Sequence, residues 1–93
     1  MFSLKTEVVE MRGQRIIVRE FTAGARAAVV EAAKTSPLQA QIVAAHQCAV
    51  DDKGALLCKT AAEAAAWPTD VVEAVADAAM RLSGVSADQA PKA

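Results

Sequence analysis

Large aromatic side chains are scarce in this chain of 93 residues, which has no tyrosine and only Phe2, Phe21 and Trp67. The apolar set makes up 54% of the sequence, but alanine alone supplies 23 of its members. A core so rich in alanine gains stability from close backbone approach more than from bulky side chains. Association with another chain is a natural supplement for such a core. The composition therefore predicts one small domain that forms oligomers.

Long hydrophobic runs are absent as well, and this bears on the compartment. The best uncharged stretch, 35–50, is interrupted by Gln39, Gln41, His46 and Gln47, so we expect a buried or interface helix there and not a membrane span. The first residues lack the apolar core of a secretory signal peptide. Two cysteines, Cys48 and Cys58, do not make a disulfide scaffold. These features predict a cytoplasmic protein with free thiols.

Charge of one sign is not in excess either. The formal net charge is −1, which argues against broad electrostatic binding to nucleic acid or to an anionic membrane. The four glycines stand far apart, so no phosphate-binding loop is present.

The N-terminal residues contain most of the strand pattern. Segments 7–11 and 15–19 are rich in β-branched residues and flank Arg12-Gly13-Gln14, which predicts a β-hairpin. Ile16 and Val18 fall on one face, while Ile17 and Phe21 fall on the other. Because both faces carry apolar residues and an isolated hairpin is marginal in water, we expect one face to meet helices and the other to meet another chain.

The chain from residue 22 onward is predicted to be helical. Thr22 is an N-cap for a helix over 23–34, and Ser36 with Pro37 opens a second helix. That helix has an apolar stripe and is followed by a turn over 51–54 and an extended segment over 55–57. The stripe consists of Leu38, Ile42, Ala45 and Ala49.

Two further helices follow the turn. Thr60 and Glu63 match a capping box for a short helix that Pro68 terminates. The last helix is predicted to begin at Thr69 or Asp70 and to end before Gly84. Its charged residues occupy one narrow side, and on that side Asp77 and Arg81 are spaced to form an i, i+4 ion pair. Its apolar arc exceeds half the circumference, so this helix is predicted to be central or to touch a second surface. The candidate oligomer or partner contacts are Ile17, Phe21, Val71, Val72, Val75, Met80 and Leu82.

The fold class that follows is α+β, mostly α. A hairpin and a bundle of three to four helices form one domain over 1–84, and 85–93 is expected to be a flexible tail.

Residues with chemical potential do not combine into a known site. His46, Cys48 and Cys58 match no usual zinc spacing, and His46 and Cys48 point in different directions on one helix. Asp51 and Asp52 are adjacent in a turn, where such residues form the turn itself. We therefore expect no catalytic, cofactor-binding or metal-binding residues. The only basic group is interleaved with glutamates, so ion pairing is its expected use; it consists of Arg12, Arg15, Arg19 and Arg26.

Three segments in this order resemble one protein family. They are Phe21-Thr22-Ala23-Gly24-Ala25-Arg26 at a strand-to-helix junction, the uncharged helix and Asp-rich turn Ala44-Ala45-His46-Gln47-Cys48-Ala49-Val50-Asp51-Asp52-Lys53-Gly54, and the helix end Ala78-Ala79-Met80-Arg81-Leu82-Ser83-Gly84. Over about 18–85 the chain is similar to the tail assembly chaperones of long-tailed bacteriophages and prophages.

This resemblance implies a non-enzymatic chaperone of the host cytoplasm that is absent from the mature virion. Such proteins bind the tape measure protein, keep it soluble and recruit tail tube subunits, and many are made in two lengths by programmed frameshifting. Ala90-Pro91-Lys92 is compatible with a slippery sequence such as C CCA AAA. The alternative is a small dimeric cytoplasmic adaptor or regulator that binds DNA through the hairpin arginines.

Overall fold

The N-terminal part of the chain forms the predicted hairpin. The computed structural model describes residues 2–84, and in it β1 (Thr6–Met11) pairs antiparallel with β2 (Gln14–Arg19). Arg12 and Gly13, between the strands, both have positive φ, +53° and +77°. A two-residue type I′ turn requires this combination, and its twist matches that of the strands it joins. Gln14, expected in the turn, is already part of β2.

A third strand, which was not expected from the sequence, completes the sheet. β3 (Ala49–Val50) follows directly after α2 (Pro37–Cys48) and pairs antiparallel with β2. The helix ends because Ala49 adopts extended backbone, although its N–H still donates to the Ala45 carbonyl. The strand order is β1-β2-β3, and Leu56 forms an isolated bridge to Val50. The segment expected to be extended, 55–57, is thereby held against β3.

The first two helices begin at the predicted caps. α1 (Ala23–Ala33) starts after Thr22, whose hydroxyl accepts the Ala25 N–H at 3.0 Å. α2 starts after Ser36, whose hydroxyl accepts the Gln39 N–H at 3.0 Å. Each hydroxyl satisfies an amide that the first helical turn leaves without a backbone partner.

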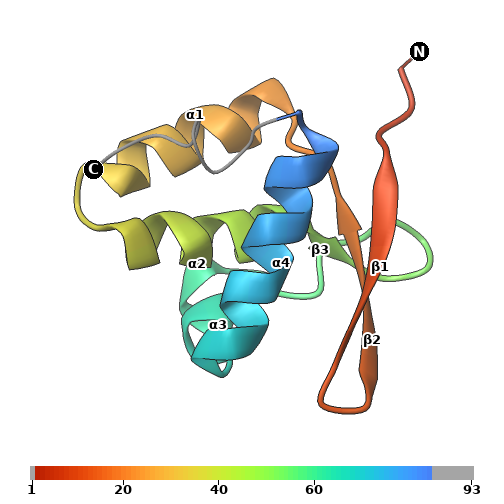
Figure 1. The fold of residues 1–93 in the computed structure, drawn as a ribbon. Helices are drawn as coiled ribbons and strands as arrows, with labels where there is room; N and C mark the ends of the chain where they lie inside the picture. The colour runs from red at the N-terminus through yellow and green to blue at the C-terminus, as the bar shows by residue number, and fades with distance from the viewer. Residues whose placement is uncertain (1, 85–93) are drawn as a thin grey trace.

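The apolar stripe predicted along α2 is buried only toward its C-terminal end. Ala45 is fully buried and Ile42 is half-buried, but Leu38 in the first turn is 47% exposed. Ala49 is buried as a strand residue and not as a helical one. The reason is that the C-terminal half of α2 packs against α4 and the sheet, whereas the first turn extends past them (Figure 1).

The last two helices also begin where predicted. α3 (Ala61–Ala65) has Thr60 as its N-cap, and the Glu63 carboxylate accepts the Lys59 N–H at 3.2 Å. The capping box thus closes one residue earlier than its usual form. α4 (Thr69–Leu82) starts directly after Pro68 and has no side-chain cap.

The helices lie on one side of the sheet (Figure 1). α4 packs against β1 and β2 and also against α2, and α1 packs on α2. Even the largest of the almost completely buried side chains are only medium in size: Val18, Cys48, Cys58 and Val75. The predicted class, α+β and mostly α with an N-terminal hairpin, is confirmed.

Residues 85–93 lie outside the described part of the chain. The expected tail and the segment Ala90–Lys92 both fall there. Within residues 2–84, no helix has the length and apolar character needed to cross a bilayer.

Candidate functional site

The face of the sheet that points away from the helices carries an apolar groove. Side chains alternate along β1 and β2, so Ile16 and Val18 point into the core while Val8 and Ile17 point outward. The groove has a volume of about 430 Å³. Its lining consists of Val8, Arg15, Ile17, Val50, Asp51, Asp52 and Leu57.

Three strands contribute one residue each to the floor of this groove. Val8 lies opposite Ile17 in the β1–β2 register, and Ile17 lies opposite Val50 in the β2–β3 register. Val50 is buried, whereas Val8 and the neighbouring Leu57 are each 44% exposed. The result is a continuous row of β-branched side chains across the sheet, open to solvent at the β1 end.

The wall of the groove is the tight loop between β3 and Leu57. The Asp51 carboxylate accepts the N–H groups of Lys53 and Ala55 at 2.8 and 2.9 Å, and Gly54 has a φ of +83°. An aspartate that bonds backbone amides ahead of it stabilises a turn of this kind. The predicted turn-forming role of Asp51 is therefore confirmed.

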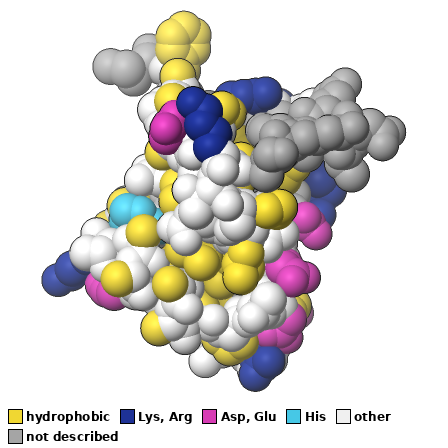
Figure 2. All heavy atoms as spheres, turned by 90° about the vertical axis from the view of Figure 1, so that its left-hand side faces the viewer, with side chains coloured by type: hydrophobic (Ala, Val, Ile, Leu, Met, Phe, Trp, Pro, Cys, Tyr) yellow, Lys and Arg dark blue, Asp and Glu magenta, His cyan; other side chains and the backbone are white. Residues whose placement is uncertain are grey.

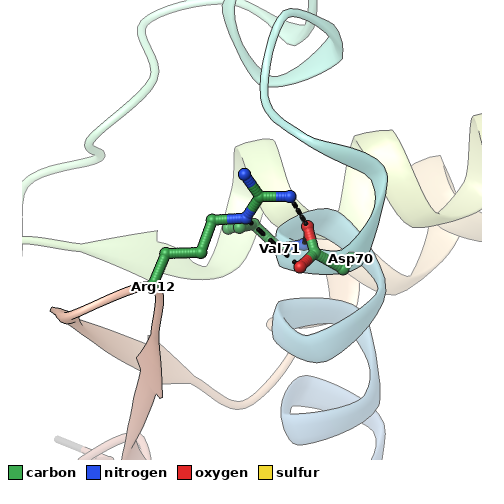
Figure 3. A network of polar contacts seen from close by, with 3 residues as sticks. All are labelled: Arg12, Asp70 and Val71. Atoms are coloured by element: carbon green, nitrogen blue, oxygen red, sulfur yellow. Dashed lines mark hydrogen bonds and ion pairs between the residues drawn. The ribbon is translucent and has the colours of Figure 1, made fainter.

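A bidentate ion pair ties the tip of the hairpin to the start of α4 (Figure 3). Arg12 Nη2 donates to Asp70 Oδ1 at 3.0 Å, and Arg12 Nε donates to Asp70 Oδ2 at 3.2 Å. The Val71 N–H also donates to Asp70 Oδ1 at 2.9 Å. The hydrogen bonds from Arg12 are the main reason why the pKa of the Asp70 carboxyl lies below its usual value.

The other end of α4 is tied to the same strand. Arg81 pairs with Glu7 on β1, so the i, i+4 pair with Asp77 expected from the sequence is wrong. Glu7 is on the inward side of β1, where α4 packs, so its carboxylate lies within reach of Arg81 and pairs with it in place of Asp77. The two ion pairs join the ends of α4 to the hairpin, while the buried valines of α4 pack against the inner face of the sheet and leave its outer face to solvent.

Most of the basic group is engaged within the chain. Arg15 lies 3.7 Å from Glu10 in the adjacent strand, which confirms cross-strand ion pairing, and Arg19 Nε donates to the Gln47 carbonyl at 3.1 Å near the end of α2. With Arg12 bound to Asp70, three of the four arginines have partners. This arrangement weakens the alternative in which the hairpin arginines bind DNA phosphates.

The predicted contact residues do not form one surface. Ile17 lines the groove and Phe21 is half-buried between the two parts of the core. Of the two alternatives predicted for the apolar arc of α4, a central helix or a contact with a second surface, the structure shows the first for three valines. They are at most 8% exposed, because the sheet lies on one side of the helix and α2 on the other, so they are not available as partner contacts. These are Val71, Val72 and Val75. Met80 and Leu82 are half-buried, and Leu82 packs against the core.

Sequence reasoning missed three residues of the groove: Val8, Val50 and Leu57. A two-residue turn at Arg12-Gly13 sets the register and would have placed Val8 beside Ile17. No comparable pattern in the sequence places Val50 or Leu57 in the groove, because β3 is only two residues long.

Both cysteines are buried thiols. Burial raises the pKa of Cys48 to about 12, with a smaller opposing effect of Arg19. Burial also raises the pKa of Cys58, and the Glu63 carboxylate adds to the rise. A thiol with a raised pKa stays protonated near neutral pH, which makes it a poor nucleophile. Among residues 2–84, histidine, cysteine and acidic side chains do not gather in groups of three that suit a metal ion.

The helix-bearing side of the molecule has a different character. Apolar side chains there are mixed with polar atoms and backbone, and the single histidine reaches this surface (Figure 2). Its exposed large apolar residues, Val30 on α1 and Leu38 on α2, belong to different helices.

Comparisons with known proteins add no relative. The chain matches no family model, and neither the curated proteins nor the solved structures contain a significant match.

Proposed function

We propose that this chain is a non-enzymatic tail assembly chaperone of a long-tailed phage or prophage. It acts in the bacterial cytoplasm, binds the tape measure protein and helps to recruit tail tube subunits. The proposal joins the family resemblance of the sequence to one structural observation, the uncovered apolar groove on the outer face of the sheet.

The groove suits a segment of a partner protein better than a small substrate. Its floor is aliphatic, and its lining also includes charges of both signs, from Arg15 and from Asp51 and Asp52. An amphipathic helix presents apolar side chains at i, i+3 and i+4 with charges beside them, and such a helix matches an apolar groove whose lining also includes charges. A tape measure protein, which is long and helical, offers many segments of this kind.

The test is co-expression of the chain with fragments of the tape measure protein encoded in the same genome. We expect at least one fragment to stay soluble and to co-elute with the chain. Ile17→Asp and Leu57→Asp place a charge in the groove and should weaken this binding at least about tenfold, as loss of a central contact does.

Leu38→Asp is the matched control, because Leu38 is as exposed as Leu57 but lies on α2. It should leave binding unchanged, and circular dichroism should show that all three variants are folded. If no fragment is kept in solution, or if Leu38→Asp weakens binding as much as Ile17→Asp, the proposal is wrong. The genome offers a second check: the gene should lie between the genes for a tail tube protein and a tape measure protein.

A further inference from the structure

The residues before β1 form an apolar arm that the rest of the chain does not cover. The arm, residues 2–4, projects beyond the end of β1 (Figure 1). Its Phe2 is 98% exposed, although phenylalanine occurs only twice in the sequence, and its Leu4 is 36% exposed. Among residues 2–84, four of the six exposed large apolar residues belong to this arm or to the outer groove: Phe2, Leu4, Val8 and Leu57. Apolar exposure concentrated in this way marks an interaction surface.

The base of the arm is fixed to the sheet. The Lys5 N–H donates to the Glu20 carboxylate at 2.6 Å, and the Lys5 carbonyl accepts the Glu20 N–H at 2.9 Å. The arm is therefore free only as far as Leu4, and three extended residues span at most about 10 Å.

This short arm cannot cover the groove of its own chain. Val8, on the floor of the groove, follows Lys5 along β1, whereas the arm leaves Lys5 in the opposite direction. A reversal needs a turn of at least two residues, which would use Ser3 and Leu4 and leave Phe2 beside Lys5. Phe2 can therefore be covered by a groove of this kind only on another copy of the chain.

We propose that the arm of a second copy occupies the groove, and that two copies exchange their arms about a two-fold axis. In an extended arm Phe2 and Leu4 point to the same side, so both can face the aliphatic floor formed by Val8, Ile17 and Val50. The exchange covers the apolar side chains of both arms and both grooves together. Exchange of an identical segment is a low-cost route from monomer to dimer.

The charges of the two surfaces favour this occupant. Lys5 is the only charged residue of segment 2–5, whereas the groove is lined by one positive and two negative side chains. Arg15 already lies 3.7 Å from Glu10, and Asp51 accepts the backbone amides of its own turn. Neither Lys5 nor Asp52 takes part in the ion pairs formed among residues 2–84. Because Lys5 directly follows the arm, docking brings its ammonium group to the groove, where it supplies Asp52 with an opposite charge.

Phe2→Ser tests the arm without altering the groove. Phe2 is almost fully exposed in the single chain, so the substitution leaves the core intact and circular dichroism should not change. Two arms of three residues bury less area than a standard interface, and light scattering should therefore show a dimer of the parent chain that dissociates on dilution. The dissociation constant should rise at least about tenfold in Phe2→Ser and in Leu57→Asp. Leu38→Asp, which is similarly exposed but lies on α2, should leave it unchanged.

Cysteine cross-linking identifies the surface that the arm meets. A mixture of Phe2→Cys chains with Leu57→Cys or Val8→Cys chains should form disulfide-linked dimers under mild oxidation, because a disulfide forms where Cα atoms come within about 4.4–6.8 Å. Phe2→Cys alone should not, since the two arms lie in different grooves. A mixture of Phe2→Cys with Leu38→Cys chains is the matched control, and the cysteines of the parent chain are buried.

Three results would overturn the inference: a parent chain that is monomeric at the highest attainable concentration, a Phe2→Ser dimer as tight as that of the parent, or a control mixture that cross-links as fast as the groove mixtures. The inference does not depend on the tape measure protein as client. Because Phe2 lies outside the groove, Phe2→Ser should bind a tape measure fragment at least as tightly as the parent does, so the two proposals can fail separately.

Discussion

Val75 distinguishes a core helix from a contact helix, and its replacement by alanine measures the difference. Val75 is 0% exposed at the centre of α4 and belongs to the main core cluster. The substitution removes two methyl groups, each worth about 0.8 kcal/mol when buried, and leaves a cavity that the surroundings fill only in part. We expect the free energy of unfolding to fall by about 2–3 kcal/mol, a large share of the stability of a small domain.

The assay is urea unfolding followed by the fluorescence of Trp67, the single tryptophan, which is half-buried against the core. The same loss should lower the melting temperature by roughly 10–20 °C. Val30→Ala is the control, because Val30 is 40% exposed on α1, and it should change stability by less than about 0.5 kcal/mol. If Val75→Ala unfolds at the same urea concentration as Val30→Ala and instead loses association with another chain, the placement of α4 in the core is wrong.

Three further predictions concern single groups. Asp70 has a lower pKa in the folded than in the unfolded chain, so it stabilises the fold above its unfolded pKa of about 3.9, and this contribution is lost as the pH falls through the folded pKa. Asp70→Asn should therefore be less stable than the parent in urea at pH 7, and the difference should shrink at pH 3. Cys48 and Cys58 should fail to react with a thiol reagent at pH 8 in the folded chain and should both react in urea; rapid reaction without urea would contradict their burial. Ser83→Ala removes the acceptor of the Phe21 N–H, a bond of 2.9 Å, and should cost about 1 kcal/mol of stability in the same unfolding assay; an unchanged urea midpoint would contradict it.

The candidate site was only partly predictable from the sequence. Ile17 was assigned to the face of the hairpin opposite the core, and the structure places it in the groove. The wide apolar arc of α4 predicted either a central helix or a contact with a second surface. The helix is central at Val75 and its neighbours, which are therefore not partner contacts, because the sheet and α2 enclose the helix from two sides. The pattern of one helix reports how much of its surface is apolar. It does not report how many elements of the same chain cover that surface.

The sequence by itself determined the features that depend on near neighbours in the chain. The caps at Thr22, Ser36 and Thr60 use bonds within a few residues, so residue type and spacing suffice to predict them. The hairpin was predicted as well, but its turn is one residue shorter than expected, because Arg12 adopts a positive φ beside Gly13 and Gln14 joins β2. Tertiary structure decided which strand pairings and ion pairs formed between residues far apart in the chain.

β3 is a strand only because β2 lies beside it, and Arg81 pairs with Glu7 only because β1 lies beneath α4. The outer groove exists because α4 packs its buried side chains against the inner face of the hairpin, which leaves the other face of the sheet uncovered. Such choices depend on contacts between residues tens of positions apart, and no local pattern in the chain encodes them.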